Sequence, residues 1–162
     1  MPEPLEFLND LFAKAKKAGA DAADGHHVTS QSLSTSMRMG NREDLERSES
    51  LDMMLRVFIG QRQACVASSD TSPLAMEDLV ARAVAMAKAA PEDPYCGLAP
   101  EDRLARSWPE LDLYDDFEYD AEALYGLAAE AEDAALAVEG VSNSNGAGAG
   151  WSSGEVAIAT SH

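Results

Sequence analysis

The sequence of 162 residues has few bases, few aromatic side chains and only two cysteines. Twelve Lys and Arg residues stand against 29 Asp and Glu residues, which gives a net charge of −17. Such a surface repels phosphate, so we expect no direct nucleic-acid binding and no affinity for anionic membranes. Cys65 and Cys96 are too few for a disulfide framework, so we expect reduced thiols and a cytoplasmic location.

The chain also lacks an apolar targeting or membrane-spanning segment. Its opening, MPEPLEFLND, is acidic early and has no long apolar run of the kind found in signal peptides. Arg56 interrupts the longest apolar stretch. We interpret residues 1–162 as a single α+β domain. Because the chain stops directly after a predicted strand, we expect this domain to be the N-terminal part of a longer polypeptide.

Sequence motifs for catalysis or metal binding are missing as well. There is no HExxH or CxxC pattern, and the glycines from Gly146 to Gly150 lack the lysine of a phosphate-binding loop. His26 and His27 are adjacent in a predicted strand, so they point to opposite faces and do not share an ion easily. From the residues we therefore predict no catalytic, cofactor-binding or metal-binding site in this chain.

What the sequence does contain is one long segment with clear strand alternation, residues 47–70. Alternate residues from Leu51 to Ile59 are apolar, which predicts a strand with one face on a core. Gly60 then predicts a tight hairpin, with a returning strand from Gln63 to Ser69.

Three amphipathic segments predict helices that pack on this hairpin. The first is expected at Pro4–Ala18, with a stripe that includes Leu5, Leu8 and Leu11. The second is expected at Thr71–Ala90, capped by Ser72 and stopped by Pro91. The third is expected at Asp120–Glu139. Its predicted buried face comprises Leu124, Leu127, Ala128, Ala131, Ala135 and Val138.

The remaining segments predict more strands and a long loop. We expect a connector at Asp21–Gly25, a strand at His27–Met39 with one serine-rich face, a turn at Gly40–Asn41 and a polar strand at Asp44–Ser50. Val141–Gly150 and Glu155–Thr160 are expected to form two strands around a Gly/Ser-rich turn. Between Glu92 and Glu118 the aromatic residues Tyr95, Trp108 and Tyr114 suggest an ordered loop anchored on the surface. The predicted fold class is therefore α+β: an antiparallel sheet of hairpins and a meander, covered on one side by three helices.

Four segments together resemble one protein family. They are LERSESLDMMLRVFIGQRQACVASSD, LVARAVAMAKAAPEDPYCGLA, LDLYD and GVSNSNGAGAGWSSGEVAIATS, in that order. At these spacings they resemble the N-terminal part of the PmbA/TldD family, also called modulators of DNA gyrase or TldE-like proteins. The RVFIGQRQA and APEDPY phrases resemble PmbA more than TldD.

The resemblance implies an intracellular bacterial subunit that pairs with a TldD-like subunit to form a metallopeptidase acting on peptides or unfolded proteins. It implies that zinc belongs to the TldD-like partner, so no cofactor and no catalytic residue is carried over to this chain. We expect the domain to shape the complex and to help enclose its substrate.

An unfolded peptide can add to an exposed strand edge through main-chain hydrogen bonds alone. The polar strands at Ser30–Ser36 and Leu45–Ser50 are the candidate edges, with Ser34, Ser48, Glu49 and Ser50 as the candidate peptide or partner residues. Two alternatives stay open: a stand-alone binding module without peptidase activity, and an enzyme with an unrecognised site. The sequence also leaves homo-oligomerisation open.

Overall fold

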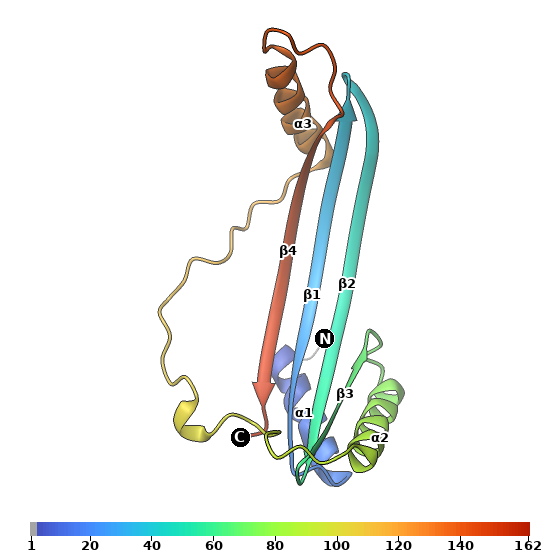
Figure 1. Cartoon of the computed structure of the whole chain (residues 1–162), viewed down its shortest axis with the longest axis vertical. Coiled ribbons are helices and arrows are strands. Elements are labelled where there is room, and N and C mark those ends of the chain that lie inside the picture. Colours follow the sequence, from blue (N-terminus) through green and yellow to red (C-terminus); the bar gives the residue numbers. More distant parts are fainter. Residues whose placement is uncertain (1–2) are drawn as a thin grey trace. The chain divides into compact units, whose positions relative to one another are not determined.

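The computed structural model describes residues 3–162, which form three α-helices, one short 3₁₀ helix and a four-stranded sheet (Figure 1). In chain order the elements are α1 (Pro4–Lys17), β1 (Ala22–Arg38), β2 (Asn41–Ile59), β3 (Arg62–Ser68), α2 (Pro73–Ala89), η1 (Glu101–Arg103), α3 (Ala121–Leu136) and β4 (Ala147–Thr160). The sheet order is β3-β2-β1-β4, so β1, β2 and β3 form a meander and β4 adds beside β1. The predicted α+β class is confirmed.

The chain divides into two compact units, which we describe separately. One comprises Met1–Thr29, Ser50–Pro109 and Glu155–His162, and the other comprises Ser30–Glu49 and Glu110–Gly154. We call them the α1/α2 unit and the α3 unit after the helices that they contain. The long strands β1, β2 and β4 contribute residues to both.

The core of the α1/α2 unit forms where helices α1 and α2 pack on alternating residues of β2. Met53, Leu55 and Val57 are completely buried on one face of this strand, as its alternation predicts. The helices contribute apolar stripes to the same cluster, with Leu8, Leu11 and Ala15 from α1 and Leu79, Ala83 and Ala87 from α2. Leu5 was expected in the α1 stripe but is 47% exposed.

The predicted hairpin after β2 is confirmed. Ile59 faces Arg62 in an antiparallel register that continues to Met53 and Ser68. Gly60 lies in the turn with a φ of +57°, a conformation that glycine adopts at little cost. The predicted cap of α2 is also confirmed, because the Ser72 Oγ accepts a hydrogen bond from the Ala75 N–H.

Two predictions about β1 and its turn are wrong. The segment Asp21–Gly25 was expected to be a connector, but it is strand from Ala22 onward. The small residues at the start of β1 do not show the apolar alternation that predicts a strand. The turn is Met39–Gly40 and not Gly40–Asn41. Both turn residues have positive φ, +49° and +73°, as a two-residue hairpin of the I′ type requires.

The core of the α3 unit is small and differs from its prediction. Met37 from β1 packs against Tyr125 and Ala128 from α3. The expected face included Leu127 and Val138, but these side chains are 45% and 58% exposed. Leu124 and Ala128 are buried as predicted, and Tyr125 and Glu132 are buried beside them without having been expected there. The predicted cap is correct, since the Asp120 carboxylate accepts from the Ala123 N–H.

The last strand was predicted as two strands around a turn, and this is wrong. β4 is continuous from Ala147 to Thr160. Small residues at its start allow close approach to β1: a Cβ added at Gly148 would lie 3.2 Å from the Thr35 carbonyl oxygen. The small Gly and Ser residues therefore allow β4 to pack closely against β1.

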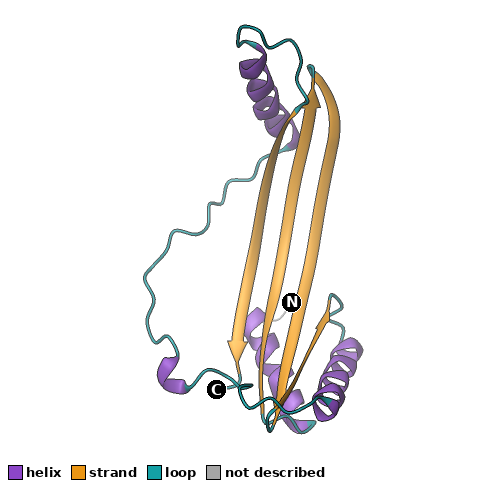
Figure 2. Cartoon of the chain, viewed as in Figure 1, coloured by secondary structure: helices purple, strands orange, loops and turns teal. Residues whose placement is uncertain are grey.

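The segment between α2 and α3 is loop apart from η1 (Figure 2). Its aromatic side chains were expected to anchor it, but Tyr95, Trp108 and Tyr114 are 94%, 78% and 70% exposed. The prediction of aromatic anchors is therefore wrong.

Candidate functional site

The predicted edge at Ser34 is wrong because β1 is an interior strand. The sheet order places β1 between β2 and β4, so both of its backbone edges have strand neighbours. Ser34 is exposed, but its backbone lies between two strand neighbours. A peptide cannot add as a strand along Ser30–Ser36.

The second predicted edge lies on β2. β3 pairs with Met53–Ile59 in the register above, and the part of β2 that precedes Met53 extends beyond that register. All residues from Asn41 to Ser50 are exposed. Ser48 and Glu49 lie within the α3 unit, whereas Ser50 opens a segment of the α1/α2 unit. We therefore define the β2 edge as Leu45–Glu49.

The β2 edge carries charges, as exposed sheet edges commonly do. Arg47 and Glu49 are two residues apart on one face and form an ion pair at 3.1 Å. Both side chains are more than half exposed, so this pair contributes little stability. Charged side chains of this kind discourage unselective edge-to-edge association.

Side chains from α3 hold the preceding part of β2. The Arg42 guanidinium forms two hydrogen bonds with the Glu122 carboxylate and lies 4.3 Å from the centre of the Tyr125 ring. The hydrogen bond with Arg42 lowers the pKa of Glu122. The Tyr125 hydroxyl donates to the Asp44 carbonyl oxygen at 2.9 Å. The strand is therefore fixed immediately before the β2 edge begins.

Glu132 clamps the β1–β2 turn, and sequence analysis missed it. Its carboxylate oxygens accept hydrogen bonds from the Met39 and Gly40 N–H groups, both at 2.8 Å. The side chain is 2% exposed. The bond from Gly40 is the largest cause of a lowered pKa for Glu132, followed by a bond with Ser144. Nothing in the sequence distinguishes Glu132 from the other acids of the alanine-rich helix α3, so its contact with the turn could not be predicted.

The two cysteines are free thiols, as predicted from their number. Partial desolvation raises the pKa of the Cys65 thiol, although the Arg56 guanidinium opposes the effect. A raised pKa keeps the thiol protonated, whereas nucleophiles and metal ligands need the thiolate. Desolvation therefore disfavours the thiolate form of Cys65.

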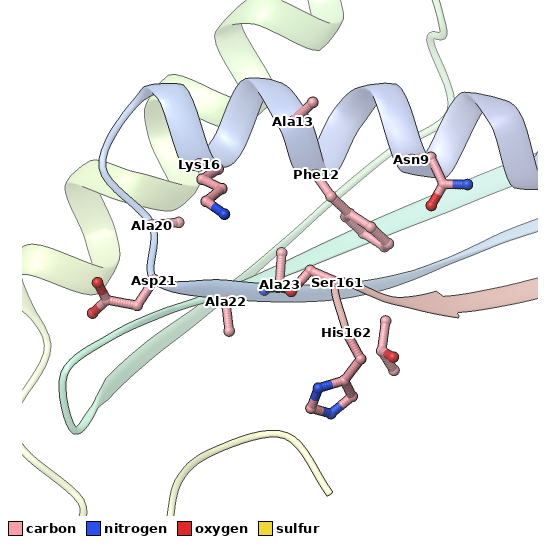
Figure 3. Close-up of a pocket in the computed structure, with 11 residues that line it drawn as sticks. Asn9, Phe12, Ala13, Lys16, Ala20, Asp21, Ala22, Ala23, Ser161 and His162 are labelled. Atoms are coloured by element: carbon pink, nitrogen blue, oxygen red, sulfur yellow. Dashed lines mark hydrogen bonds between the residues drawn. The ribbon is translucent and has the colours of Figure 1, made fainter. Parts of the chain in front are cut away.

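A small cavity of about 210 Å³ lies between the C-terminal half of α1, the start of β1 and the end of β4 (Figure 3). Backbone and side chain of Ser161 both bond Ala23, and the Asp21 carboxylate accepts from the Gly60 N–H. A His162 ring nitrogen lies 2.9 Å from the Ala99 carbonyl oxygen. These polar groups of Asp21, Ser161 and His162 are therefore engaged in holding neighbouring segments together.

Comparison with known proteins identifies the fold described above. Residues 27–87 match the model of PmbA/TldA metallopeptidase domain 1. A metalloprotease PmbA homolog from Haemophilus influenzae is 37% identical over 150 residues, which are 91% of this chain and 33% of that protein. The chain belongs to the PmbA/TldD family.

A second relative agrees with this assignment, and a solved structure shares the fold. Metalloprotease PmbA from Escherichia coli O157:H7 is 30% identical over 134 residues, which are 81% of this chain and 30% of that protein. TldE from Thermococcus kodakarensis shares the fold, with a TM-score of 0.80 at 17% identity over 96% of this chain and 35% of that one. The chain thus spans about a third of the length of the curated PmbA relatives that it matches.

The metal of a metallopeptidase does not fit the part of this PmbA/TldD chain that the structure describes. Residues 3–162 bring together no group of three His, Cys, Asp or Glu side chains that could hold an ion. A zinc site with three or four protein ligands therefore has no counterpart among them. Among the same residues, none of the helices has the length and apolar character needed to cross a bilayer.

Proposed function

We propose that this chain is a non-catalytic, substrate-enclosing part of a PmbA-type subunit that works with a TldD-like zinc subunit to cleave peptides or unfolded proteins. The observation that carries the proposal is the 37% identity with a metalloprotease PmbA homolog over 91% of the chain. The similarity to TldE supports a partner of the TldD type. Any zinc is proposed to belong to that partner.

The β2 edge is the proposed contact for an extended peptide. Leu45–Glu49 lies beyond the register of β3 and is exposed throughout. Main-chain hydrogen bonds along such an edge bind peptides of varied sequence, because they require no particular side chain. This property suits a peptidase that accepts unfolded substrates.

The first experiment tests the pairing. The protein is co-expressed with a TldD-type subunit, and the two are purified through a tag on one of them. We expect a stable heteromer that hydrolyses a fluorogenic unfolded substrate, whereas this protein alone does not. If the two subunits fail to co-purify, the chain is better explained as a stand-alone binding module. Metal-dependent hydrolysis by this protein alone would instead support an enzyme in its own right.

The second experiment tests the β2 edge with proline substitutions at two adjacent positions. Successive N–H groups of an antiparallel strand point to opposite sides, so Ser48→Pro and Glu49→Pro remove one inward and one outward donor. The inward change lowers the melting temperature by breaking the pairing with β1. The outward change leaves it nearly unchanged and weakens peptide capture by the heteromer about 3- to 10-fold, the effect of roughly one hydrogen bond.

The matched controls are Ser48→Thr and Glu49→Gln, which keep the backbone N–H and should retain capture. Unchanged capture in both proline variants, with the heteromer intact, would show that peptides do not use this edge.

A further inference from the structure

The α1/α2 unit contains a larger cavity, of about 670 Å³, that no step of the proposed peptidase uses. Its walls come from α1, β1, the start of α2 and the beginning of the β4 segment that belongs to this unit. Sites for small organic ligands have volumes of roughly 300–1,000 Å³ and are mostly apolar, with a few polar groups. This cavity fits that description, since Phe7 and Met76 line it together with His27.

His27 is the polar group at the wall of this cavity. Its side chain is 6% exposed and meets the Phe7 ring edge-on, with ring centres 5.7 Å apart. It forms no hydrogen bond with any of residues 3–162, yet these residues include no completely buried side-chain nitrogen or oxygen without a partner. Its ring nitrogens are therefore not completely enclosed, and His27 is among the residues that line the cavity. A ligand N–H group inside the cavity can replace water as the hydrogen-bond partner of such a nitrogen.

The rim of the cavity is negatively charged. Glu3, Asp10 and Glu155 line it, and the one base among the lining residues, Lys14, is paired with Asp10 at 2.7 Å. Two carboxylates thus have no cation beside them within the lining. A rim of this charge repels anions and attracts cations.

We infer that this cavity binds an organic cation with an apolar body. The apolar body lies against Phe7 and Met76, and the aromatic face of Phe7 favours a neighbouring positive charge. The cationic N–H group donates to a ring nitrogen of His27. Glu3 and Glu155 supply the attraction at the rim. The inference is independent of the peptidase proposal, because it rests on the cavity alone.

The test compares three probes that each contain a benzene ring and differ in the charge of the attached group: benzylamine, benzyl alcohol and benzoate. Each is titrated into the isotope-labelled protein while the amide signals of Phe7, His27 and Met76 are followed by NMR. We expect saturable shifts with benzylamine, at least threefold weaker binding of benzyl alcohol and no binding of benzoate. Equal affinity for the amine and the alcohol, or no saturable shift with benzylamine, would overturn the inference.

Variants of the protein then separate the contribution of the rim carboxylates from that of the hydrogen bond to His27. Glu3→Gln with Glu155→Gln changes only exposed side chains and should weaken benzylamine roughly 2- to 5-fold without affecting benzyl alcohol. The matched control is Glu101→Gln, an exposed acid outside the cavity lining, which should change neither. His27→Phe keeps an aromatic ring against Phe7 and removes the acceptor, so benzylamine should again bind more weakly. Full affinity in the double rim variant would overturn the role of charge.

A fourth probe identifies the natural source of the cation. Blocked arginine, with its amino and carboxyl groups amidated, stands in for a basic side chain of a peptide. Tighter binding of blocked arginine than of benzylamine assigns the cavity to a basic side chain. The reverse order assigns it to a free amine. Failure of both to bind contradicts the cation site itself.

Discussion

Gly25 occupies a position in β1 where a side chain has no room. A Cβ added there would lie 2.5 Å from the Met54 carbonyl oxygen, and 3.4 and 3.5 Å from atoms of Phe12 and Leu8. Because the nearest atom belongs to the backbone of the neighbouring strand, the clash cannot be relieved by a side-chain rotation. Close packing of α1 and β2 against β1 therefore depends on this glycine.

We predict that Gly25→Ala lowers the free energy of unfolding by about 1–3 kcal/mol, the usual cost of overpacking a core. The matched control is Gly126→Ala on the exposed surface of α3, where nothing lies within 4 Å of the added Cβ. Alanine in a helix should stabilise by about 0.5–1 kcal/mol relative to glycine. Urea unfolding measures both changes. An unaltered midpoint for Gly25→Ala would contradict the close approach of β1 and β2.

At the scale of elements, helix α3 is joined to the β1–β2 hairpin by the Glu132 carboxylate. The turn places Met39 at positive φ, which is unfavourable for a residue with a side chain. The two hydrogen bonds from Glu132 satisfy the N–H groups of this strained turn. One carboxylate thus fixes both the turn and the orientation of the helix on it.

This arrangement predicts an acid-sensitive clamp. The pKa of Glu132 is lowered from 4.5 in the folded protein, so its stabilisation is complete above about pH 4.5 and is lost as the pH falls through the lower folded value. Hydrogen exchange at the Met39 and Gly40 amides should become faster over that range, beyond the intrinsic pH effect. In Glu132→Gln, which has one acceptor oxygen, at least one of these two amides should be poorly protected at every pH.

The control for the clamp is Glu130→Gln, which changes an exposed acid on the same helix. It should keep the protection of both amides and their pH dependence. Equal protection of these amides in the Glu132 and Glu130 variants would show that the carboxylate does not hold the turn.

The accuracy of prediction from sequence also differs between elements for physical reasons. α1, α2 and the β2–β3 hairpin were predictable because large apolar residues mark their buried faces and because Ser72 and Gly60 have distinct local roles. The buried face of α3 was predictable only in part, at Leu124 and Ala128, because the helix is rich in alanine and because Glu132, an acid, makes the hydrogen bonds to the β1–β2 turn. β4 was missed because glycine and serine favour turns locally, whereas packing against β1 decides its conformation.

The candidate peptide edges were predictable only in part, because the order of strands in the whole sheet decides which strand has a free edge. Ser34 and Ser48 lie in similar polar stretches, and the sequence gives them equal standing. Strand order separates them: β4 joins the sheet beside β1 from a distant part of the chain, while β3 ends its pairing at Met53. Strand neighbours that are distant in the sequence cannot be predicted from the local pattern of residue types in Ser30–Ser36.

For the whole molecule, the excess of 17 negative charges should oppose folding at low ionic strength. Six ion pairs among residues 3–162 act in the other direction, and all include at least one partner that is 40% exposed or more. Pairs of this kind contribute little each, so the repulsion should dominate. Screening shortens the range of interaction from about 30 Å at 0.01 M to about 8 Å at 0.15 M salt.

We therefore predict that the melting temperature rises between these two salt concentrations. Sodium chloride and potassium chloride should give the same increase, because general screening does not depend on the identity of the cation. A difference between the two salts would indicate specific binding of one of the two cations. A melting temperature that falls with both salts would mean that the local ion pairs outweigh the repulsion among the carboxylates.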